Sequence, residues 1–314
     1  MKTEDSLKKF KYKVAAFYNF ITIKDQEILL IKEELTKLAT NHEIKGTILL
    51  ASEGVNGTVC GTENVIIQFI ETLVKLLKIS DINVKYSWTD KQAFRRFKAR
   101  QKKEIVTIGL KQVNPAKSVG KYIKACEWNE FLEDPDSVVI DTRNEYEIKI
   151  GNFTGALNPH TSSFREFPAW VQKYLKPLVD KNPSIKIGMY CTGGIRCEKA
   201  TSYLIDEGFS DVHHLEGGIL KYLEDVSPDK SLWEGECFVF DQRVSLDHEL
   251  TPGSHRMCHA CGLPISPEDL KKPTYIKGLQ CEACVNKFTD SDRARFAERQ
   301  RQIDEIMKRL PENS

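Results

Sequence analysis

A cysteine followed at once by a tight glycine turn constrains this chain more than any other feature. The stretch reads Cys191-Thr192-Gly193-Gly194-Ile195-Arg196-Cys197. Residues 185–190 before it are short, apolar and partly β-branched, which predicts a buried strand. Residues 198–208 after it carry apolar side chains at helical spacing and stop at a glycine, which predicts a helix. The chain therefore passes from a strand through a glycine turn into a helix directly at a cysteine.

Such a turn creates an electropositive pocket for the cysteine. Successive backbone N–H groups and the positive end of the helix dipole point to one place. This field favours the thiolate and lowers the pKa of Cys191. We expect Cys191 to be a nucleophile that carries a persulfide, with Arg196 folded over the loop as a fixed cation. The expected N–H cradle comprises Thr192, Gly193, Gly194, Ile195 and Cys197. Cys197 either resolves the persulfide as a disulfide or packs beneath the loop.

Two chemistries use a Cys-x-x-Gly-x-Arg loop in this setting. One is sulfur transfer in the rhodanese superfamily, and the other is phosphate ester hydrolysis by cysteine phosphatases. Phosphatase loops are longer, because a phosphoryl group is larger than one sulfur atom. Only four residues separate Cys191 from Arg196, which favours the persulfide. The alternative is a strand–turn–helix junction in which the buried cysteine has only a structural role.

The flanking sequence also resembles the rhodanese pattern. Residues 138–143 form a predicted strand that ends in Asp141-Thr142-Arg143, and residues 212–219 resemble the closing strand and Gly-Gly turn. We expect Asp141 and Arg143 to brace the loop as an ion pair at the carboxyl end of a strand. Residues 126–226 are thus predicted to form a rhodanese-like domain, an open parallel α/β sheet covered on both faces.

The N-terminal residues 1–90 predict a different order of strands and helices. Strands are expected at 13–20, 46–51, 57–60 and 82–88, and helices at 25–40 and 63–78. The order β-α-β-β-α-β is that of a ferredoxin-like domain. A turn over residues 52–56 joins the two middle strands. Its sequence Glu53-Gly54-Val55-Asn56-Gly57 is explained by turn chemistry or, alternatively, by a polar loop that faces a substrate.

Positive charge is concentrated in a predicted connector, residues 91–125. Lys85–Lys124 holds twelve Lys or Arg residues against Asp90 and Glu104, whereas the whole chain has a net charge of +1. With Phe94 and Phe97 interleaved, this band suits a phosphate backbone and unpaired bases, which favours structured or single-stranded RNA over duplex DNA. The alternative is a solvated linker with the phenylalanines in a core. The candidate RNA-binding residues are Arg95, Arg96, Lys98, Arg100, Lys102 and Lys103.

The C-terminal region, residues 227–314, carries two Cys-x-x-Cys pairs. Cys258, Cys261, Cys281 and Cys284 have the two-knuckle spacing of a four-thiolate zinc site. Such a closed tetrahedron would be structural, because no ligand position stays open for chemistry. An iron–sulfur cluster or metal-free thiols are the alternatives, and His255 or His259 could replace a cysteine. Residues 291–310 predict a charged helix with Phe296, Ile303, Ile306 and Met307 near one face.

The chain as a whole is typical of a cytoplasmic protein. Its longest early apolar run, residues 14–18, is far too short to span a membrane, and no signal peptide is evident. The nine cysteines lie in reactive or metal-type spacings and not in a disulfide framework. No Gly-rich dinucleotide fingerprint appears, so no nucleotide cofactor is expected.

These features together resemble the bacterial rhodanese-domain tRNA uridine hydroxylases. The resemblance covers about residues 12–284, and its matching stretches include Asp141–Glu147, Cys191–Cys197, Ser52–Thr58, Lys103–Val106 and Gly151–Phe153. It implies an oxygen-dependent enzyme that converts the wobble uridine of certain tRNAs to 5-hydroxyuridine. It also implies that Cys191 is the catalytic cysteine and acts through a persulfide.

The residues alone leave other functions open. A thiolate cradle beside a basic band predicts sulfur transfer, including tRNA thiolation, as readily as hydroxylation, and no His, His, carboxylate iron site stands out. Sulfur transfer would need a sulfur donor protein or a small persulfide as partner. A non-catalytic RNA-binding scaffold is the third hypothesis, which the intact Cys191 and Arg196 disfavour.

Overall fold

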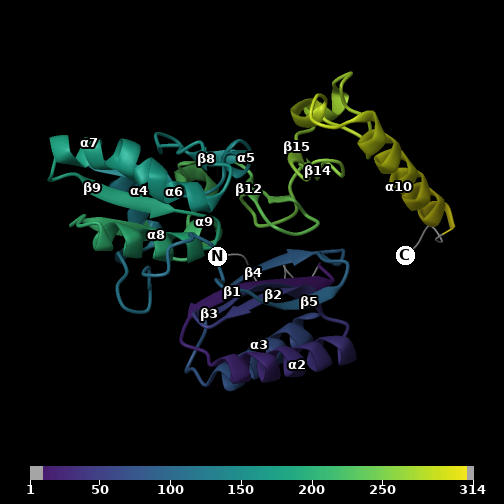
Figure 1. The fold of residues 1–314 in the computed structure, drawn as a ribbon, viewed down its shortest axis with the longest axis horizontal. Coiled ribbons are helices and arrows are strands. Elements are labelled where there is room, and N and C mark those ends of the chain that lie inside the picture. Colours follow the sequence, from purple (N-terminus) through teal and green to yellow (C-terminus); the bar gives the residue numbers. More distant parts are fainter. Residues whose placement is uncertain (1–9, 310–314) are drawn as a thin grey trace. The chain divides into compact units, whose positions relative to one another are not determined.

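The computed structural model describes residues 10–309. The chain divides into two compact units (Figure 1). The larger unit runs to Gln242 and includes Leu246–Pro252, and the smaller unit comprises Arg243–Ser245 and the residues from Gly253 onward. The larger unit contains two sheets with their own helices, here called the N-terminal domain and the central domain.

The N-terminal domain is a five-stranded sheet with two helices on one face (Figure 1). The strand order β4-β1-β3-β2-β5 contains the 4-1-3-2 arrangement of the predicted ferredoxin-like fold. Helices α2 and α3 bury residues such as Ile28, Leu35 and Phe69 against the sheet. The elements are β1 (Tyr12–Phe20), α2 (Asp25–Asn41), β2 (Lys45–Ala51), β3 (Gly54–Gly61), α3 (Glu63–Leu77), β4 (Val84–Thr89) and β5 (Phe97–Gln101).

Two details of this domain differ from the sequence-based expectation. Strand β5 lies inside the predicted connector and pairs in parallel with β2. Its Phe97 packs against the core, with its ring 6.1 Å from that of Phe69, and is half-buried. The turn between β2 and β3 comprises Ser52 and Glu53 alone, because Ala51 and Gly54 already pair as strand partners.

The second face of this sheet points away from the helices. Along β1, Ala15 and Phe17 enter the helix-covered core, so Ala16 and Tyr18 lie on the other face. By the same alternation, Asn56 and Thr58 of β3 and Lys85 of β4 share that face. We call it the open face of the N-terminal sheet.

The central domain is an open parallel sheet with strand order β6-β10-β9-β7. One core lies beneath the helical segment 164–181 and α8, and a second lies beneath α4 and α9, so helices cover both faces. The main elements are β6 (Lys121–Ile123), α4 (Ala125–Glu133), β7 (Ser137–Asp141), α5 (Glu145–Ile148), β9 (Lys186–Tyr190), α8 (Ile195–Asp206), β10 (Val212–Leu215) and α9 (Gly218–Asp225). The segment 164–181 comprises η1 (Phe164–Glu166), α6 (Phe167–Trp170), η2 (Val171–Leu175) and α7 (Lys176–Lys181).

Short strands and turns follow the central sheet. Strand β8 (Gly151–Phe153) pairs antiparallel with β11 (Trp233–Gly235). The remaining elements up to the smaller unit are η3 (Pro228–Lys230), β12 (Cys237–Phe238) and β13 (Ser245–Leu246). No helix within residues 10–309 has the length and apolarity that a membrane span requires.

The smaller unit has little apolar core apart from its cysteines. Cys258, Cys281, Cys284 and Ile265 are its principal buried cluster. On the C-terminal helix, Phe296 is buried against Phe288 but Ile306 is exposed, so the predicted apolar face is only partly covered. The elements are β14 (Arg256–Met257), β15 (Pro264–Ile265), η4 (Asp269–Lys271), η5 (Glu282–Cys284) and α10 (Asp290–Arg309).

Candidate active site

The Cys191 loop connects the end of β9 to the start of α8. Its last residue before the helix, Gly194, has a φ of +97°, which side-chain-bearing residues rarely adopt. A Cβ atom at Gly194 would lie 2.8 Å from the hydroxyl of Tyr18, so a larger residue there would also displace this hydroxyl. This conformation lets the Gly194 N–H donate a hydrogen bond of 3.1 Å to Sγ of Cys191.

The Cys191 thiol is buried yet acidic. Burial alone would raise its pKa, but the hydrogen bond from the Cys197 thiol, the charge of Arg196 and nearby backbone N–H groups lower the pKa to about 5. The pKa of Cys197 is raised well above its ordinary value, first by burial and then by its bond to Cys191. At neutral pH, Cys191 is therefore a thiolate and Cys197 a proton-bearing donor beside it.

The cation of the loop is held by a carboxylate. Nη1 and Nη2 of Arg196 each donate a hydrogen bond of 2.7 Å to the carboxylate of Glu147, and both side chains are buried. Glu147 belongs to α5 and was not singled out as a site residue from the sequence. Its partner is far away along the chain, so local patterns carry no signal for this pair.

Asp141 and Arg143 form a second buried ion pair. Arg143 donates to Asp141 through Nε and Nη2, and Nη2 also donates to the carbonyl oxygen of Gly151 at 2.6 Å. Both side chains are almost fully inaccessible and neither lines the cavity described below. The pair fixes the segment between β7 and β8, which carries Glu147.

A cavity of about 540 Å³ opens beside Cys191. The loop forms one wall with Cys191, Thr192, Gly193, Ile195 and Arg196. The open face of the N-terminal sheet forms another wall with Ala16, Tyr18, Asn56, Thr58 and Lys85. The rings of Phe94, Phe164 and Phe240 add apolar surface. Each domain of the larger unit therefore contributes to one site that suits a planar organic group.

The sequence patterns missed several polar groups beside this cavity. The hydroxyls of Tyr18 and Tyr122 both donate to the carboxylate of Glu198, at 2.9 and 3.1 Å. Burial raises the pKa of Glu198. Lys85 is buried on the open face, although it alternates with the apolar Val84 and Tyr86 of β4 and therefore belongs to the polar side of that strand, so the sequence gives no signal of its burial.

A buried lysine joins the two domains. Nζ of Lys199 in α8 forms ion pairs with Glu53 at 2.9 Å and with Glu104 at 2.7 Å. The predicted turn over residues 53–57 therefore does two things: Glu53 holds the other domain, while Asn56 and Gly57 line the cavity.

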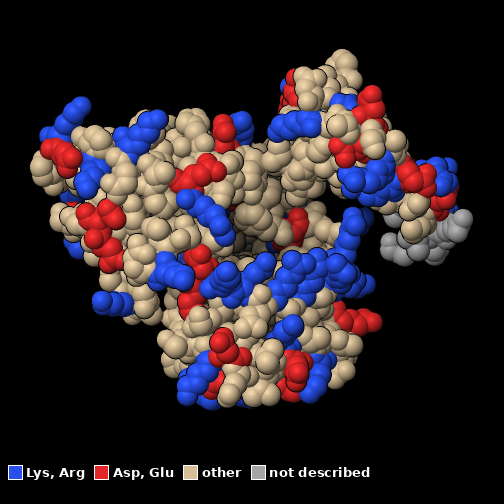
Figure 2. Space-filling model, viewed as in Figure 1, with Lys and Arg blue, Asp and Glu red and all other residues tan. Residues whose placement is uncertain are grey.

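The predicted RNA-binding residues lie on the surface of the N-terminal domain. Arg95, Arg96, Arg100, Lys102 and Lys103 are exposed, and Lys98 is half-buried. Figure 2 shows Lys and Arg side chains gathered in a band over the part of this domain that contains β5. Lys102 also lines the Cys191 cavity.

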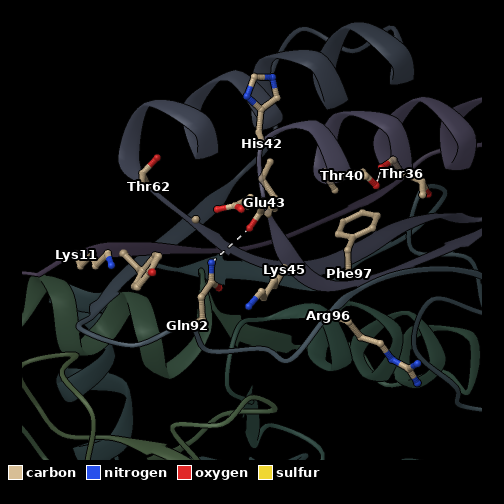
Figure 3. A pocket seen from close by; sticks show the side chains of 14 residues that line it. Lys11, Thr36, Thr40, His42, Glu43, Lys45, Thr62, Gln92, Arg96 and Phe97 are labelled. Carbon is tan, nitrogen blue, oxygen red and sulfur yellow. Dashed lines mark hydrogen bonds between the residues drawn. The ribbon is translucent and has the colours of Figure 1, made fainter. Parts of the chain in front are cut away.

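Arg96 borders a separate hollow of about 580 Å³ (Figure 3). Lys45 and Phe97 line it as well, and Nε2 of Gln92 donates to the carbonyl oxygen of Glu43 at 3.5 Å. Cys191 does not line this hollow. The basic band therefore extends beyond the cysteine site.

The four cysteines of the smaller unit form one cluster. Their sulfur atoms all lie within 4.8 Å of one another, with 4.0 Å between Cys258 and Cys284 and 3.7 Å between Cys261 and Cys281. Four thiolates around a tetrahedral zinc, each at about 2.3 Å, would be separated by about 3.8 Å. The cluster could thus hold a metal such as zinc, and within the described residues neither His255 nor His259 belongs to it.

Comparisons with known proteins agree with this architecture. Residues 12–105 match the UPF0176 acylphosphatase like domain, and residues 125–225 match the rhodanese-like domain. A "tRNA uridine(34) hydroxylase" of Prochlorococcus marinus (strain NATL2A) is 88% identical over all of this chain and 98% of that protein. The chain belongs to the tRNA uridine(34) hydroxylase family.

Two further members of the hydroxylase family share about half of their residues with this chain. The protein of that name from Prochlorococcus marinus (strain MIT 9303) is 55% identical over 93% of this chain and 94% of its own length. The one from Synechococcus sp. (strain CC9605) is 54% identical over 93% and 91%. Membership of the hydroxylase family confirms the predicted resemblance and the predicted fold class.

Proposed function

We propose that this chain hydroxylates uridine 34 of cytoplasmic tRNA to 5-hydroxyuridine, with dioxygen as the source of the added atom. The observation that carries the proposal is the 88% identity with a tRNA uridine(34) hydroxylase over the full chain. The acidic thiol in a cavity that is large enough for a nucleobase agrees with it.

Cys191 supplies the nucleophile in this proposal. Its thiolate persists at neutral pH because the pKa is about 5. Gly194 N–H and the neighbouring amides of the loop hold a second negative group such as a persulfide sulfur. Arg196 stabilises both charges, and Glu147 fixes the direction of its guanidinium. Asp141 and Arg143 keep Glu147 in position from outside the cavity.

The basic band supplies most of the binding free energy for the tRNA in this proposal. Exposed Arg95, Arg96 and Arg100 would contact phosphates, which gives sequence-independent and salt-dependent affinity. The wobble base would leave its stack to enter the Cys191 cavity. The four cysteines of the smaller unit would bind one structural zinc ion.

Sulfur transfer is the second candidate function. The hydrogen bond from Gly194 to Sγ of Cys191 favours it, since the same cradle stabilises a persulfide awaiting an acceptor. In that case the partner would be a sulfur donor protein or a small persulfide, and the product could be a thiolated tRNA.

Nucleoside composition after reaction separates the two functions. Unmodified tRNA is incubated with the protein in air and without oxygen, and wobble nucleosides are measured by exact mass. Nominal mass is not sufficient, because gain of an oxygen and exchange of oxygen for sulfur add the same nominal mass. The proposal expects 5-hydroxyuridine in air alone and none with Cys191→Ser. A sulfur-containing nucleoside that forms equally without oxygen would establish sulfur transfer.

A further inference from the structure

Lys85 is buried, although buried lysines in proteins normally have an ion-pair partner. It projects from β4 on the open face, lines the Cys191 cavity and is only 5% exposed. Its Nζ has no hydrogen-bond partner within the described part of the chain. Nζ lies over the aromatic ring of Tyr18, 4.6 Å from its centroid, in a cation–π contact.

Burying an unpaired ammonium destabilises a fold. The neighbouring anions do not remove this penalty by pairing, since Nζ of Lys85 forms no hydrogen bond with them within the described residues. Burial lowers the pKa of Lys85 to about 8, opposed by the charges of Cys191, Glu198 and Glu216 and assisted by that of Lys221. Lys85 is therefore mostly charged at neutral pH. A destabilising group that a fold retains in a cavity is typical of a functional site.

The cavity holds this cation together with a nucleophile. Cys191 lies on the loop wall and Lys85 on the wall from the N-terminal sheet. A cavity of about 540 Å³ with phenylalanine rings admits a pyrimidine base that has left its stack. Uracil has two carbonyl groups, but only the C4–O4 carbonyl is conjugated with the C5–C6 double bond. Attack at C6 therefore sends negative charge to O4.

We propose that Lys85 is a catalytic residue that binds O4 of the uracil base and stabilises its negative charge when the sulfur of Cys191 adds to C6. The proposal rests on the proposed function, because it takes the wobble uridine as substrate. In this step a sulfur lone pair forms the S–C6 bond. The π pair of C5–C6 moves to C4–C5, and the π pair of C4–O4 moves to O4. Nothing is oxidised or reduced, and the ammonium of Lys85 balances the new charge.

The resulting enolate makes C5 nucleophilic. C5, the atom that is hydroxylated in the proposed function, can take a proton from solvent. In the absence of oxygen, loss of the original C5 proton and expulsion of the sulfur regenerate uridine. This reversal exchanges the C5 hydrogen with solvent, so the addition can be observed separately from hydroxylation.

The test measures deuterium at C5 of uridine 34 after anaerobic incubation of tRNA with the full-length protein in D2O. We expect exchange with the unaltered protein and none with Cys191→Ser. Lys85→Met keeps the length and removes the charge, and it should slow exchange about 10²–10³-fold, the usual effect of one lost oxyanion donor. Lys85→Arg should recover part of the rate. Lys75→Met makes the same change at an exposed lysine of α3 and should leave exchange unaltered.

Two further readouts separate catalysis from structure. The melting temperature of Lys85→Met should equal or exceed that of the unaltered protein, because an unpaired buried charge is gone. Its tRNA affinity should change less than twofold. A Lys85→Met protein that keeps the exchange rate would overturn the proposal. So would a lower melting temperature with no recovery in Lys85→Arg, which would show a structural role.

The outcome for the unaltered protein distinguishes this proposal from the proposed function. If it forms 5-hydroxyuridine in air but exchanges no C5 hydrogen without oxygen, hydroxylation stands and the addition step is wrong. If it does neither, both are wrong.

Discussion

The guanidinium of Arg196 and the carboxylate of Glu147 face each other through two hydrogen bonds of 2.7 Å in a buried site. The pair ties the first turn of α8 to α5, so the cation beside Cys191 has a fixed position. Bidentate pairs of this geometry are among the strongest polar contacts in proteins. Removing one partner leaves the other charge buried and unpaired.

Glu147→Ala should therefore destabilise the larger unit strongly. We expect the free energy of unfolding in urea to fall by about 3–5 kcal/mol, as for other broken buried pairs. Glu145→Ala, two residues earlier, removes contacts with the exposed side chains of Lys149 and His160 and should cost less than about 1 kcal/mol. Equal effects of the two substitutions would show that the Arg196–Glu147 pair does not hold the loop.

The reactivity of Cys191 should titrate near pH 5. The thiolate reacts with iodoacetamide and the thiol does not, so the alkylation rate should fall as the pH drops through about 5. Arg196→Met removes a charge that lowers this pKa, and its inflection should move to higher pH. Arg165→Met changes an exposed arginine and serves as the control. Peptide mass spectrometry identifies the alkylated cysteine. If the inflection of Arg196→Met stays at the same pH, Arg196 does not lower the pKa of Cys191.

The basic band should determine the salt dependence of tRNA binding. Replacing Arg95, Arg96 and Arg100 with alanine should weaken binding and reduce the slope of log K against log salt by about 2–3, since each lost phosphate contact contributes about 0.7–0.9. The control replaces Lys32, Lys37 and Lys75 on the helix side of the same domain. Binding that responds equally to both triple substitutions would mean that net charge alone matters.

The smaller unit should depend on metal. Protein purified without chelator is expected to contain about one zinc per chain, and Cys258→Ser with Cys281→Ser should remove it and unfold this unit. Cys126→Ser alters an exposed cysteine outside the cluster and should keep the metal. Elemental analysis that finds no metal in freshly prepared, reduced protein would refute the zinc assignment.

Much of the fold could be predicted because its signals are local. The strand, glycine turn and helix around Cys191 follow from apolar spacing and from glycines, and the order of elements in the N-terminal domain follows from periodicity alone. The spacing of the four C-terminal cysteines likewise brings them together without knowledge of the rest of the fold.

The features that sequence patterns missed depend on distant partners. Strand β5 carries charged residues as many edge strands do, so its sequence predicts part of a connector, although it pairs with β2. Glu147 and Lys85 acquire their roles only when α5 meets α8 and when the open face meets the Cys191 loop. No local pattern contains that information.

Isotope labelling identifies the source of the oxygen atom that the protein adds to uridine 34. Unmodified tRNA would be incubated with the protein under ¹⁸O₂ in ordinary water, and the wobble nucleoside would be analysed by exact mass. We expect one heavy oxygen in 5-hydroxyuridine at position 34, and no such product with Cys191→Ser. A product that takes its oxygen from water, or that forms equally well with Cys191→Ser, would contradict the proposed function.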